Sequence, residues 1–286
     1  MKRLILVLLV ITGCSQTNKK EQVSDESWTP KSWIEDRASK SEDRLKATQA
    51  GAKVWRSIEA HGGLDRWFSN GPIGFRFDYK PLDGGTRRNT YQTVDQWSVT
   101  AVHKWLDDES VSFGWDGKEA WLFPDSANIP INPRFWSTTP FYFLGLPFVL
   151  ADDGINYEEL PSQELDGAIY DLVKVTYQSG TGDAPGDYYV IYINQETQLM
   201  GALRYIVSYP GFFQNGGHFP EKIMRISGLS EVDGVKLSTG YQTFWWKEDS
   251  IGEHITNIDV LDVSFNNDLD KTFFNRPDGA KVQQGY

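Results

Sequence analysis

Cysteine and histidine are scarce in this sequence of 286 residues, which contains one cysteine, Cys14, and four histidines. A chain with a single cysteine forms no internal disulfide, so packing has to stabilise its fold. The spacing of the histidines fits no metal-binding motif; they are His61, His103, His218 and His254. We therefore expect neither a metal ion nor another cofactor.

Four aspartates in turn-like segments offer carboxylate oxygens: Asp152, Asp153, Asp183 and Asp187. Their spacing does not match a calcium-binding loop. Aspartate in a turn commonly accepts a hydrogen bond from its own backbone, and we interpret these residues in that way.

Catalytic signatures are also missing. The sequence contains no His-Glu-x-x-His, no Gly-x-Ser-x-Gly, no phosphate-binding loop and no dinucleotide fingerprint. A pair of carboxylates for glycoside hydrolysis stays open as an alternative, because the distance between two side chains is not readable from a sequence. We expect a protein that is not an enzyme, and no catalytic residue is assigned.

Basic residues are outnumbered, with 28 Lys and Arg against 39 Asp and Glu and a formal net charge of −11. Such a chain repels phosphate backbones and anionic lipid surfaces, which excludes nucleic acid as a partner. Attachment to a membrane would have to come from covalent lipid and apolar contacts.

Long hydrophobic runs are absent, and the first apolar run, Leu4–Ile11, is shorter than the roughly 20 residues that cross a bilayer. It follows Lys2 and Arg3 and precedes small residues, which is the layout of a secretory signal. Residues 11–14, Ile-Thr-Gly-Cys, resemble the bacterial lipobox. The resemblance implies a signal peptide at residues 1–13, cleavage before Cys14 and lipid attachment to Cys14.

The remaining chain is expected to contain a lipidated N-terminus and flexible tether at residues 14–38 and one domain at residues 39–286. Ser15, rather than an aspartate, after Cys14 favours the outer membrane. We therefore expect a lipid-anchored protein of the cell envelope, facing the periplasm or the surface, and we expect it to be a monomer.

One helix is predicted near the start of the domain. Ser39 and Glu42 have the spacing of a capping box, and apolar residues then recur at helical spacing up to Ile58. Gly62 and Gly63 would end the helix after about five turns.

Strands dominate the rest. Apolar and polar residues alternate in segments such as Ile73–Tyr79, and Asp116-Gly117 and Asp233-Gly234 are strong hairpin signals. Tyr188–Ile193 is apolar on both faces, which indicates a strand covered on both sides. We expect a mainly β protein with a few helices, in which about ten or eleven strands form an antiparallel sheet.

The most apolar stretch of the domain is Thr139–Gly154, in the middle of the chain. Pro140 suits the first turn of a short helix, and Pro147 should break or kink one. We expect one or two short buried helices here. They would either close the concave face of the sheet as a lid or serve as an ordinary part of the core.

Aromatic residues are abundant, with 11 Trp, 13 Tyr and 16 Phe. They would either fill a large core or line the wall of an apolar pocket. For the second case we predict a set of ligand-binding residues from the strands and the central stretch: Phe75, Phe77, Trp97, His103, Trp105, Phe113, Trp121, Phe141, Phe143, Leu146, Phe148, Leu150 and Tyr189.

Several motifs recur together in one group of bacterial lipoproteins. They are Ala60-His61-Gly62-Gly63 with Trp67, Pro140-Phe141-Tyr142-Phe143, Leu146–Asp152, Gly182-Asp183-x-Pro185-x-Asp187-x-Tyr189 and Phe273-Phe274. On these residues, from about Ala47 to Pro277, the chain resembles a family of bacterial lipoproteins with a domain of unknown function.

The layout is also similar to that of the lipoprotein carriers LolA and LolB. The similarity implies an unclosed antiparallel β half-barrel with helices over its concave face and an apolar cavity for acyl chains. The arginine that opens the carriers' lid has no counterpart that we can match here.

The function expected from these features is binding of an acyl chain, a lipid or a lipoprotein in a lidded half-barrel. Two alternatives remain. One is an envelope hydrolase acting on glycans or esters, and the other is a structural or assembly lipoprotein that binds a protein partner.

Overall fold

A computed structural model describes residues 27–283 of the chain. Cys14 and the predicted signal peptide lie outside these residues. The helices of the described part are four α-helices and two short 3-10 helices: α1 (Lys31–Lys46), α2 (Gln49–Ala60), α3 (Leu64–Ser69), α4 (Pro133–Leu144), η1 (Phe148–Ala151) and η2 (Lys271–Phe274). No helix within residues 27–283 has the length and apolar character that crossing a membrane requires.

Thirteen strands form one sheet, and every neighbouring pair is antiparallel. The strands are β1 (Ile73–Pro81), β2 (Arg88–Asp95), β3 (Thr100–Trp105), β4 (Ser112–Trp115), β5 (Ala120–Phe123), β6 (Ile155–Leu165), β7 (Ala168–Tyr177), β8 (Tyr188–Asn194), β9 (Met200–Tyr205), β10 (Lys222–Val232), β11 (Val235–Lys247), β12 (Ser250–Phe265) and β13 (Lys281–Gln283).

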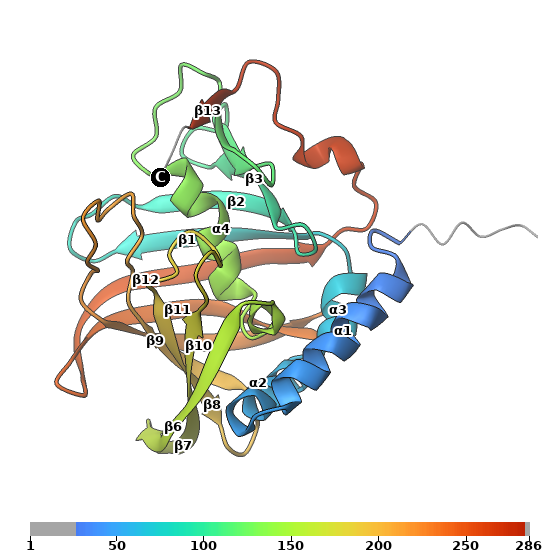
Figure 1. Cartoon of the computed structure of the whole chain (residues 1–286). Helices are drawn as coiled ribbons and strands as arrows, with labels where there is room; N and C mark the ends of the chain where they lie inside the picture. The colour runs from blue at the N-terminus through green and yellow to red at the C-terminus, as the bar shows by residue number, and fades with distance from the viewer. Residues whose placement is uncertain (1–26, 284–286) are drawn as a thin grey trace, which may run out of the picture.

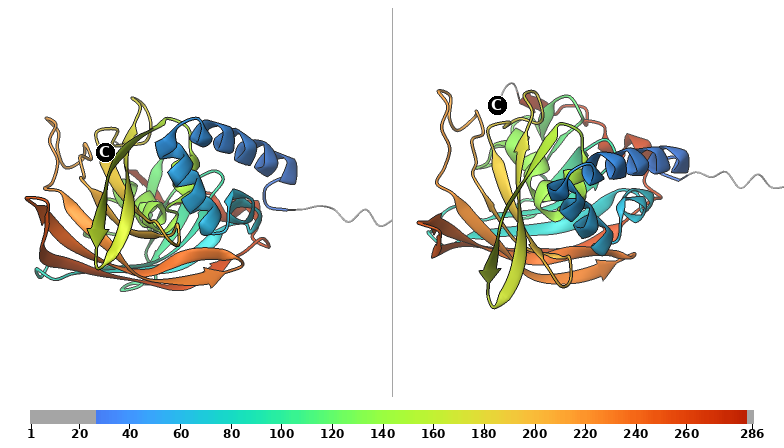
Figure 2. Two further views of the ribbon diagram at one scale, coloured as in Figure 1. Left: turned by 90° about the horizontal axis from the view of Figure 1, so that it is seen from below. Right: turned by 60° about the horizontal axis from the view of Figure 1, so that its bottom comes forward.

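The sheet is curved and does not close. Its order is β13-β5-β4-β3-β2-β1-β12-β11-β10-β9-β8-β7-β6, so β13 and β6 are its two edges. Figures 1 and 2 show the sheet bent around α4, with α1 and α2 lying across one part of its open side. The predicted mainly β fold with an unclosed antiparallel half-barrel is confirmed, with thirteen strands instead of ten or eleven.

The two additional strands are the two edges, β6 and β13. In β6, charged residues and Pro161 interrupt any regular alternation, and most side chains are exposed or half-buried. An edge strand tolerates such residues because one row of its backbone groups faces away from the sheet. The search for alternating apolar and polar residues therefore does not detect β6.

The N-terminal helix differs from its prediction. It begins at Lys31, so Ser39 lies inside α1 and is not an N-cap, and residues 31–38 are helical rather than part of a flexible tether. The chain breaks after Lys46, and the hydroxyl of Thr48 accepts a hydrogen bond from the backbone N–H of Gly51 to start α2. The predicted single helix is therefore two helices, and α2 ends before Gly62 as expected.

The central stretch forms the two short helices α4 and η1 inside the curve of the sheet. The expectation of one or two buried helices is confirmed, but the position predicted for Pro140 is wrong. Helix α4 begins at Pro133, where the Asn132 side chain accepts a hydrogen bond from the Phe135 N–H, and Pro140 lies in the helix interior. Pro147 lies between the two helices.

Strand β8 is covered on both faces, as its two-sided sequence predicted. Tyr189, Ile191 and Ile193 belong to the main core between the sheet and the helices. Val190 and Tyr192 belong to a second, smaller cluster on the opposite face, together with Leu172, Ala202, Ile223 and Trp246. The curved sheet therefore has one main core on its concave side, and the candidate site lies in that core.

Candidate functional site

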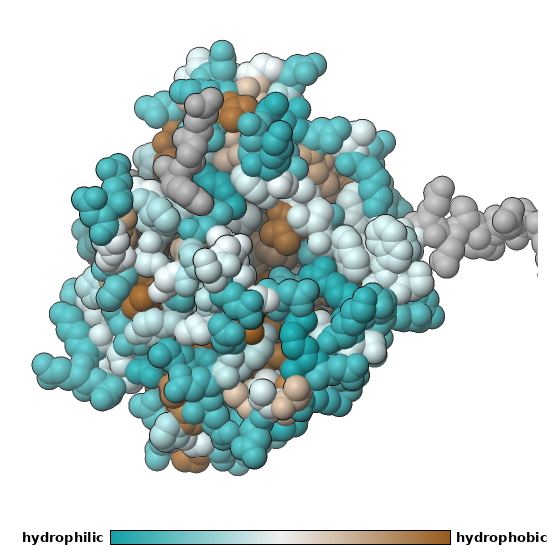
Figure 3. Space-filling model, viewed as in Figure 1, coloured by the Kyte–Doolittle hydropathy of each residue, from teal (hydrophilic) through white to brown (hydrophobic). Residues whose placement is uncertain are grey.

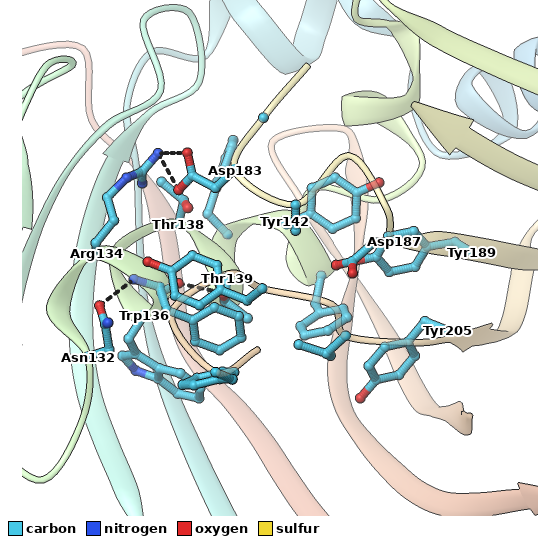
Figure 4. Close-up of a pocket in the computed structure, with 18 of the residues that line it drawn as sticks. Asn132, Arg134, Trp136, Thr138, Thr139, Tyr142, Asp183, Asp187, Tyr189 and Tyr205 are labelled. Carbon is cyan, nitrogen blue, oxygen red and sulfur yellow. Dashed lines mark hydrogen bonds and ion pairs between the residues drawn. The ribbon is translucent and has the colours of Figure 1, made fainter. Parts of the chain in front are cut away.

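A cavity of about 1090 Å³ opens inside the curve of the sheet. Its walls come from the concave side chains of the sheet, from α4, and from the segments 129–132, 181–187 and 207–219. Figure 3 shows apolar side chains in the hollowed middle of this face, and Figure 4 shows the residues around the cavity. The volume lies slightly above the roughly 300–1,000 Å³ typical of ligand pockets.

Tyrosines form one wall of the cavity. Tyr189 of β8 stacks on Tyr205 of β9 with ring centroids 5.8 Å apart, and Tyr142 of α4 lies 5.1 Å from Tyr189. The hydroxyl of Tyr142 forms a hydrogen bond with that of Tyr177. Burial raises the pKa of Tyr142 and Tyr205 above the usual range, so these hydroxyls stay neutral. Figure 4 shows the three labelled rings side by side.

An ion pair fixes the opposite wall. Nη2 of Arg134 in α4 donates to the Asp183 carboxylate, whose two oxygens lie 2.8 and 2.7 Å away, and the Arg134 guanidinium lies 3.6 Å from the ring centroid of Trp115. A hydrogen bond between two charged groups is stronger than one between neutral groups. This ion pair therefore holds the loop between β7 and β8 against α4.

Other carboxyl groups that line the cavity include Asp187 and Asp152. Asp187 accepts hydrogen bonds from the backbone N–H and the hydroxyl of Ser208, at 2.5 and 2.7 Å. Asp152 accepts from Arg37 of α1 at 2.6 Å. Burial raises the pKa of both groups, and these hydrogen bonds oppose the rise.

The two buried histidines lie outside the cavity lining. His61 contacts the Ser57 carbonyl through Nδ1, and His103 contacts the Ser137 carbonyl through Nε2, both at 2.8 Å. Burial lowers the pKa of each to about 4. His103 points to the concave side and shares the face of Trp105 and Phe113.

Three of the predicted ligand-binding residues line the cavity: Phe141, Phe143 and Tyr189. Their role in binding stays a prediction. Most of the other predicted residues pack in the core between the sheet and the helices and do not reach the cavity; these are Phe75, Phe77, His103, Trp105, Phe113, Leu146, Phe148 and Leu150.

Trp97 and Trp121 lie elsewhere than predicted. Trp97 belongs to the turn before β3, where it stacks with Trp33 and packs against Phe68, so it does not continue the concave face of the strand. Trp121 pairs with Gly114 across β4 and β5, whereas the core residue Phe113 pairs with Leu122. Trp121 therefore faces the convex side, because neighbouring residues of a strand point to opposite faces.

Sequence reasoning missed several lining residues. They include Arg134, Arg88, Lys222, Phe135, Phe212 and Phe219. Phe212 and Phe219 are 44% and 40% exposed and lie in the segment between β9 and β10. The run Tyr209-Pro-Gly-Phe-Phe is an apolar signal in a segment with no strand or helix period, and it is the one pattern from which this part was readable.

The described residues offer no metal site: within residues 27–283, no three His, Cys, Asp or Glu side chains come together in a group that would hold an ion. The chemical character of the cavity comes instead from its aromatic rings and from the charged groups at its margin.

Comparisons with known proteins agree with this architecture. No family model matches the sequence, and no curated protein matches it. A LolA superfamily protein from Nitrosomonas europaea has a similar structure, with a TM-score of 0.52 and 12% identity over 80% of this chain and 98% of its own. A DUF1329 family protein from Desulfovibrio piger gives a TM-score of 0.52 and 13% identity over 79% of this chain and 97% of its own. The expected LolA-like layout is thus confirmed for the fold.

Proposed function

We propose that this protein is a lipid-anchored protein of the bacterial cell envelope that binds an apolar ligand in the cavity of its half-barrel. The ligand is an acyl chain, a lipid or a lipoprotein. The single observation that carries the proposal is the aromatic cavity of about 1090 Å³ on the concave side of the sheet. A concave, mostly apolar cleft of this size is the usual form of a binding site for an apolar ligand.

Burial of apolar surface would supply the affinity. Each Å² of apolar surface removed from water contributes roughly 25 cal/mol. The rings of Phe141, Phe143 and Phe135 provide such surface in the cavity wall. The LolA-like fold supports the same reading, because the carriers that the sequence resembles hold acyl chains at the corresponding place.

A ligand would enter the cavity past the segment between β9 and β10. The stretch Thr139–Gly154 would stay packed against the sheet. η1 is fixed, because Phe148 is 1% exposed and stacks on Trp67 with ring centroids 4.6 Å apart. The segment between β9 and β10 carries the exposed rings of Phe212 and Phe219, which are 5.8 Å apart and line the cavity. We therefore propose this segment as the part that moves when a ligand enters.

Displacement of an uncharged, polarity-sensitive dye by a fatty acid tests this proposal. The parent protein should bind the dye and release it when the fatty acid is added. A variant with a narrowed cavity, Val207→Trp, replaces a half-buried lining residue and should bind both more weakly. Absence of dye and fatty-acid binding in the folded parent would contradict the proposal.

One observation favours the alternative that the protein is a hydrolase. The pKa values of Asp152 and Asp187 at the cavity are raised, as those of catalytic carboxyl groups often are. Each carboxyl is held by hydrogen bonds, from Arg37 and Ser208 respectively, and no histidine lines the cavity. A fluorogenic ester tests this alternative: turnover by the parent that disappears in Asp187→Asn would support it. We favour binding because aromatic and aliphatic side chains make up most of the wall, whereas both carboxyl groups are already engaged in hydrogen bonds.

A further inference from the structure

Two cationic side chains lie among the cavity's rings. Arg88 begins β2 and pairs directly with Tyr79 of β1, and Lys222 begins β10 and pairs with Tyr205 of β9 and Trp245 of β11. Directly paired residues share a face, so both cations belong to the concave side. Both are half-buried and line the cavity.

Aromatic rings are the neighbours of both cations. The Arg88 guanidinium lies 4.7 Å from the ring centroid of Tyr79 and 5.0 Å from that of Trp136. The Lys222 ammonium lies 5.5 Å from the centroid of Phe219 and 5.3 Å from that of Trp245. Contacts of this kind favour a cation, but each supplies only about 0.5–2 kcal/mol.

Neither cation has a hydrogen-bond or ion-pair partner in the part of the chain that the structure describes. Burial lowers the pKa of Lys222, and the positive charge of Arg88 acts in the same direction. A half-buried charge without a partner is unfavourable, and a bound anion would stabilise it.

None of the described carboxylates that line the cavity forms an ion pair or a hydrogen bond with Arg88 or Lys222. Asp183 pairs with Arg134, Asp152 with Arg37 and Asp153 with Arg44, and Asp187 accepts from Ser208. Asp83 is exposed and accepts from the backbone N–H of Gly85. Of the three cations that line the cavity within residues 27–283, Arg134 is paired with Asp183, and Arg88 and Lys222 have no ion-pair partner there, in a chain whose formal net charge is −11.

We propose that Arg88 and Lys222 bind the anionic head group, a carboxylate or a phosphate, of an amphiphile whose hydrocarbon part occupies the aromatic cavity. This inference rests on the proposed function and narrows its ligand to an anionic amphiphile. The planar guanidinium of Arg88 donates to two oxygens at once, and the ammonium of Lys222 adds a flexible point charge. Such an arrangement lets an acidic protein accept an anionic lipid that its surface would otherwise repel.

A pair of ligands that differ only in the head group tests the proposal. Hexadecanoate and its methyl ester are titrated against the uncharged dye bound to the parent and to Lys222→Met, Arg88→Gln and Lys222→Arg. The parent should bind hexadecanoate more tightly than the ester. Lys222→Met and Arg88→Gln should each weaken hexadecanoate binding by about tenfold or more, the usual size of a charged hydrogen bond, and leave ester binding unchanged. Lys222→Arg should keep the preference.

Lys174→Met is the matched control. Lys174 is also half-buried and also lies over a tyrosine ring, that of Tyr188 at 5.4 Å, but it faces the convex side because it pairs with Val190. This variant should bind both ligands as the parent does. An equal loss of hexadecanoate binding in Lys174→Met and Lys222→Met would overturn the proposal.

Three other outcomes separate this inference from the function on which it rests. Equal affinity of the parent for hexadecanoate and its ester would overturn the head-group site and leave the apolar binding function intact. Displacement of hexadecanoate by millimolar inorganic phosphate, without loss of the uncharged dye, would overturn the inference by identifying a free anion as the ligand. Binding of neither ligand would overturn both the inference and the proposed function.

Discussion

Phe143 and Phe148 belong to the same apolar stretch but have different surroundings. Phe148 is enclosed in the core, where its ring stacks on Trp67. Phe143 is half-buried, lines the cavity and has its ring centroid 5.5 Å from that of Tyr205. A residue that borders an open space loses fewer packing contacts on truncation than one that is enclosed.

We therefore predict that Phe148→Ala and Phe143→Ala have opposite consequences. Phe148→Ala should lower the free energy of unfolding by about 3–5 kcal/mol and leave the affinity of the remaining folded protein for a fatty acid unchanged. Phe143→Ala should cost less stability and weaken binding. Denaturant unfolding and dye displacement measure the two effects. Equal stability losses with unchanged binding would show that both residues are ordinary core.

His103 predicts a pH dependence of stability. Its pKa is lowered from 6.5 to about 4 in the folded state, so the unfolded chain binds more protons between these values, and stability rises with pH across this range. Its complete protonation on acidification should remove about 3 kcal/mol. His61, shifted in the same direction, contributes a similar slope.

The variant His103→Gln should therefore lose less stability between pH 7 and pH 4 than the parent, by about 3 kcal/mol. Urea unfolding at intervals of half a pH unit measures the difference. His218→Gln, at an exposed histidine, is the control and should follow the parent. A slope in His103→Gln equal to that of the parent would contradict the assignment of His103 as a buried neutral group.

Residue orientation was predictable where a strand alternates over several residues. Phe75, Phe77 and His103 face the concave side as their alternation indicates. Trp121 was assigned to the wrong face of the sheet. Strand β5 has only four residues and all four are apolar, so the sequence does not show which of them face the core.

At the scale of elements, the end of α2 is joined to the turn between β10 and β11. The backbone carbonyl of His61 accepts a hydrogen bond from the Lys236 N–H at 2.8 Å. Gly62 has φ of +126°, and a Cβ at this position would lie 2.4 Å from the Gly234 carbonyl oxygen. Glycine is thus required both by the backbone conformation and by the close approach of the hairpin.

Gly62→Ala should accordingly destabilise the protein by at least about 3 kcal/mol, since strain and a steric clash add. Gly84→Ala is a matched control, because Gly84 also has a positive φ, of +81°, but no atom lies within 4 Å of its added Cβ. It should cost only about 1–2 kcal/mol. Thermal or denaturant midpoints compare the two, and equal losses would show that the contact with the hairpin contributes nothing.

Elements with strong local signals were predicted well. Both hairpin turns, at Asp116-Gly117 and at Asp233-Gly234, join neighbouring strands, and Asp233 and Gly234 both have positive φ. The start of α1 was not readable, because its first turn has no side-chain cap and follows Pro30. Its position depends instead on contacts made by the folded domain, such as Arg37 with Asp152.

For the whole molecule, the anchor at Cys14 lies outside the described residues and stays a prediction of the sequence. Acyl chains would supply the attachment to the membrane, because the acidic chain is repelled by anionic lipid. Cys14→Ala should therefore abolish metabolic labelling with palmitate and move the protein out of the detergent-soluble membrane fraction. Labelling and fractionation that match the parent would contradict the anchor.

The curved sheet and its central helices were predictable from the sequence as a whole, but the cavity wall was not. Residues from distant segments form it: Arg134 and Asp183 are 49 positions apart, and Lys222 is brought to the cavity by β10. Alternation indicates which face of a strand is buried, but it does not show where loops meet or where packing leaves a space.

The most direct test of the central claim is mass spectrometry of solvent extracts from the purified full-length protein. The parent should release a lipid or fatty acid in stoichiometric amount that is distinct from the covalent anchor, and Val207→Trp, with its narrowed cavity, should release less. Extracts of the folded parent that contain only the covalently attached lipid, together with no binding of added fatty acid, would contradict the account.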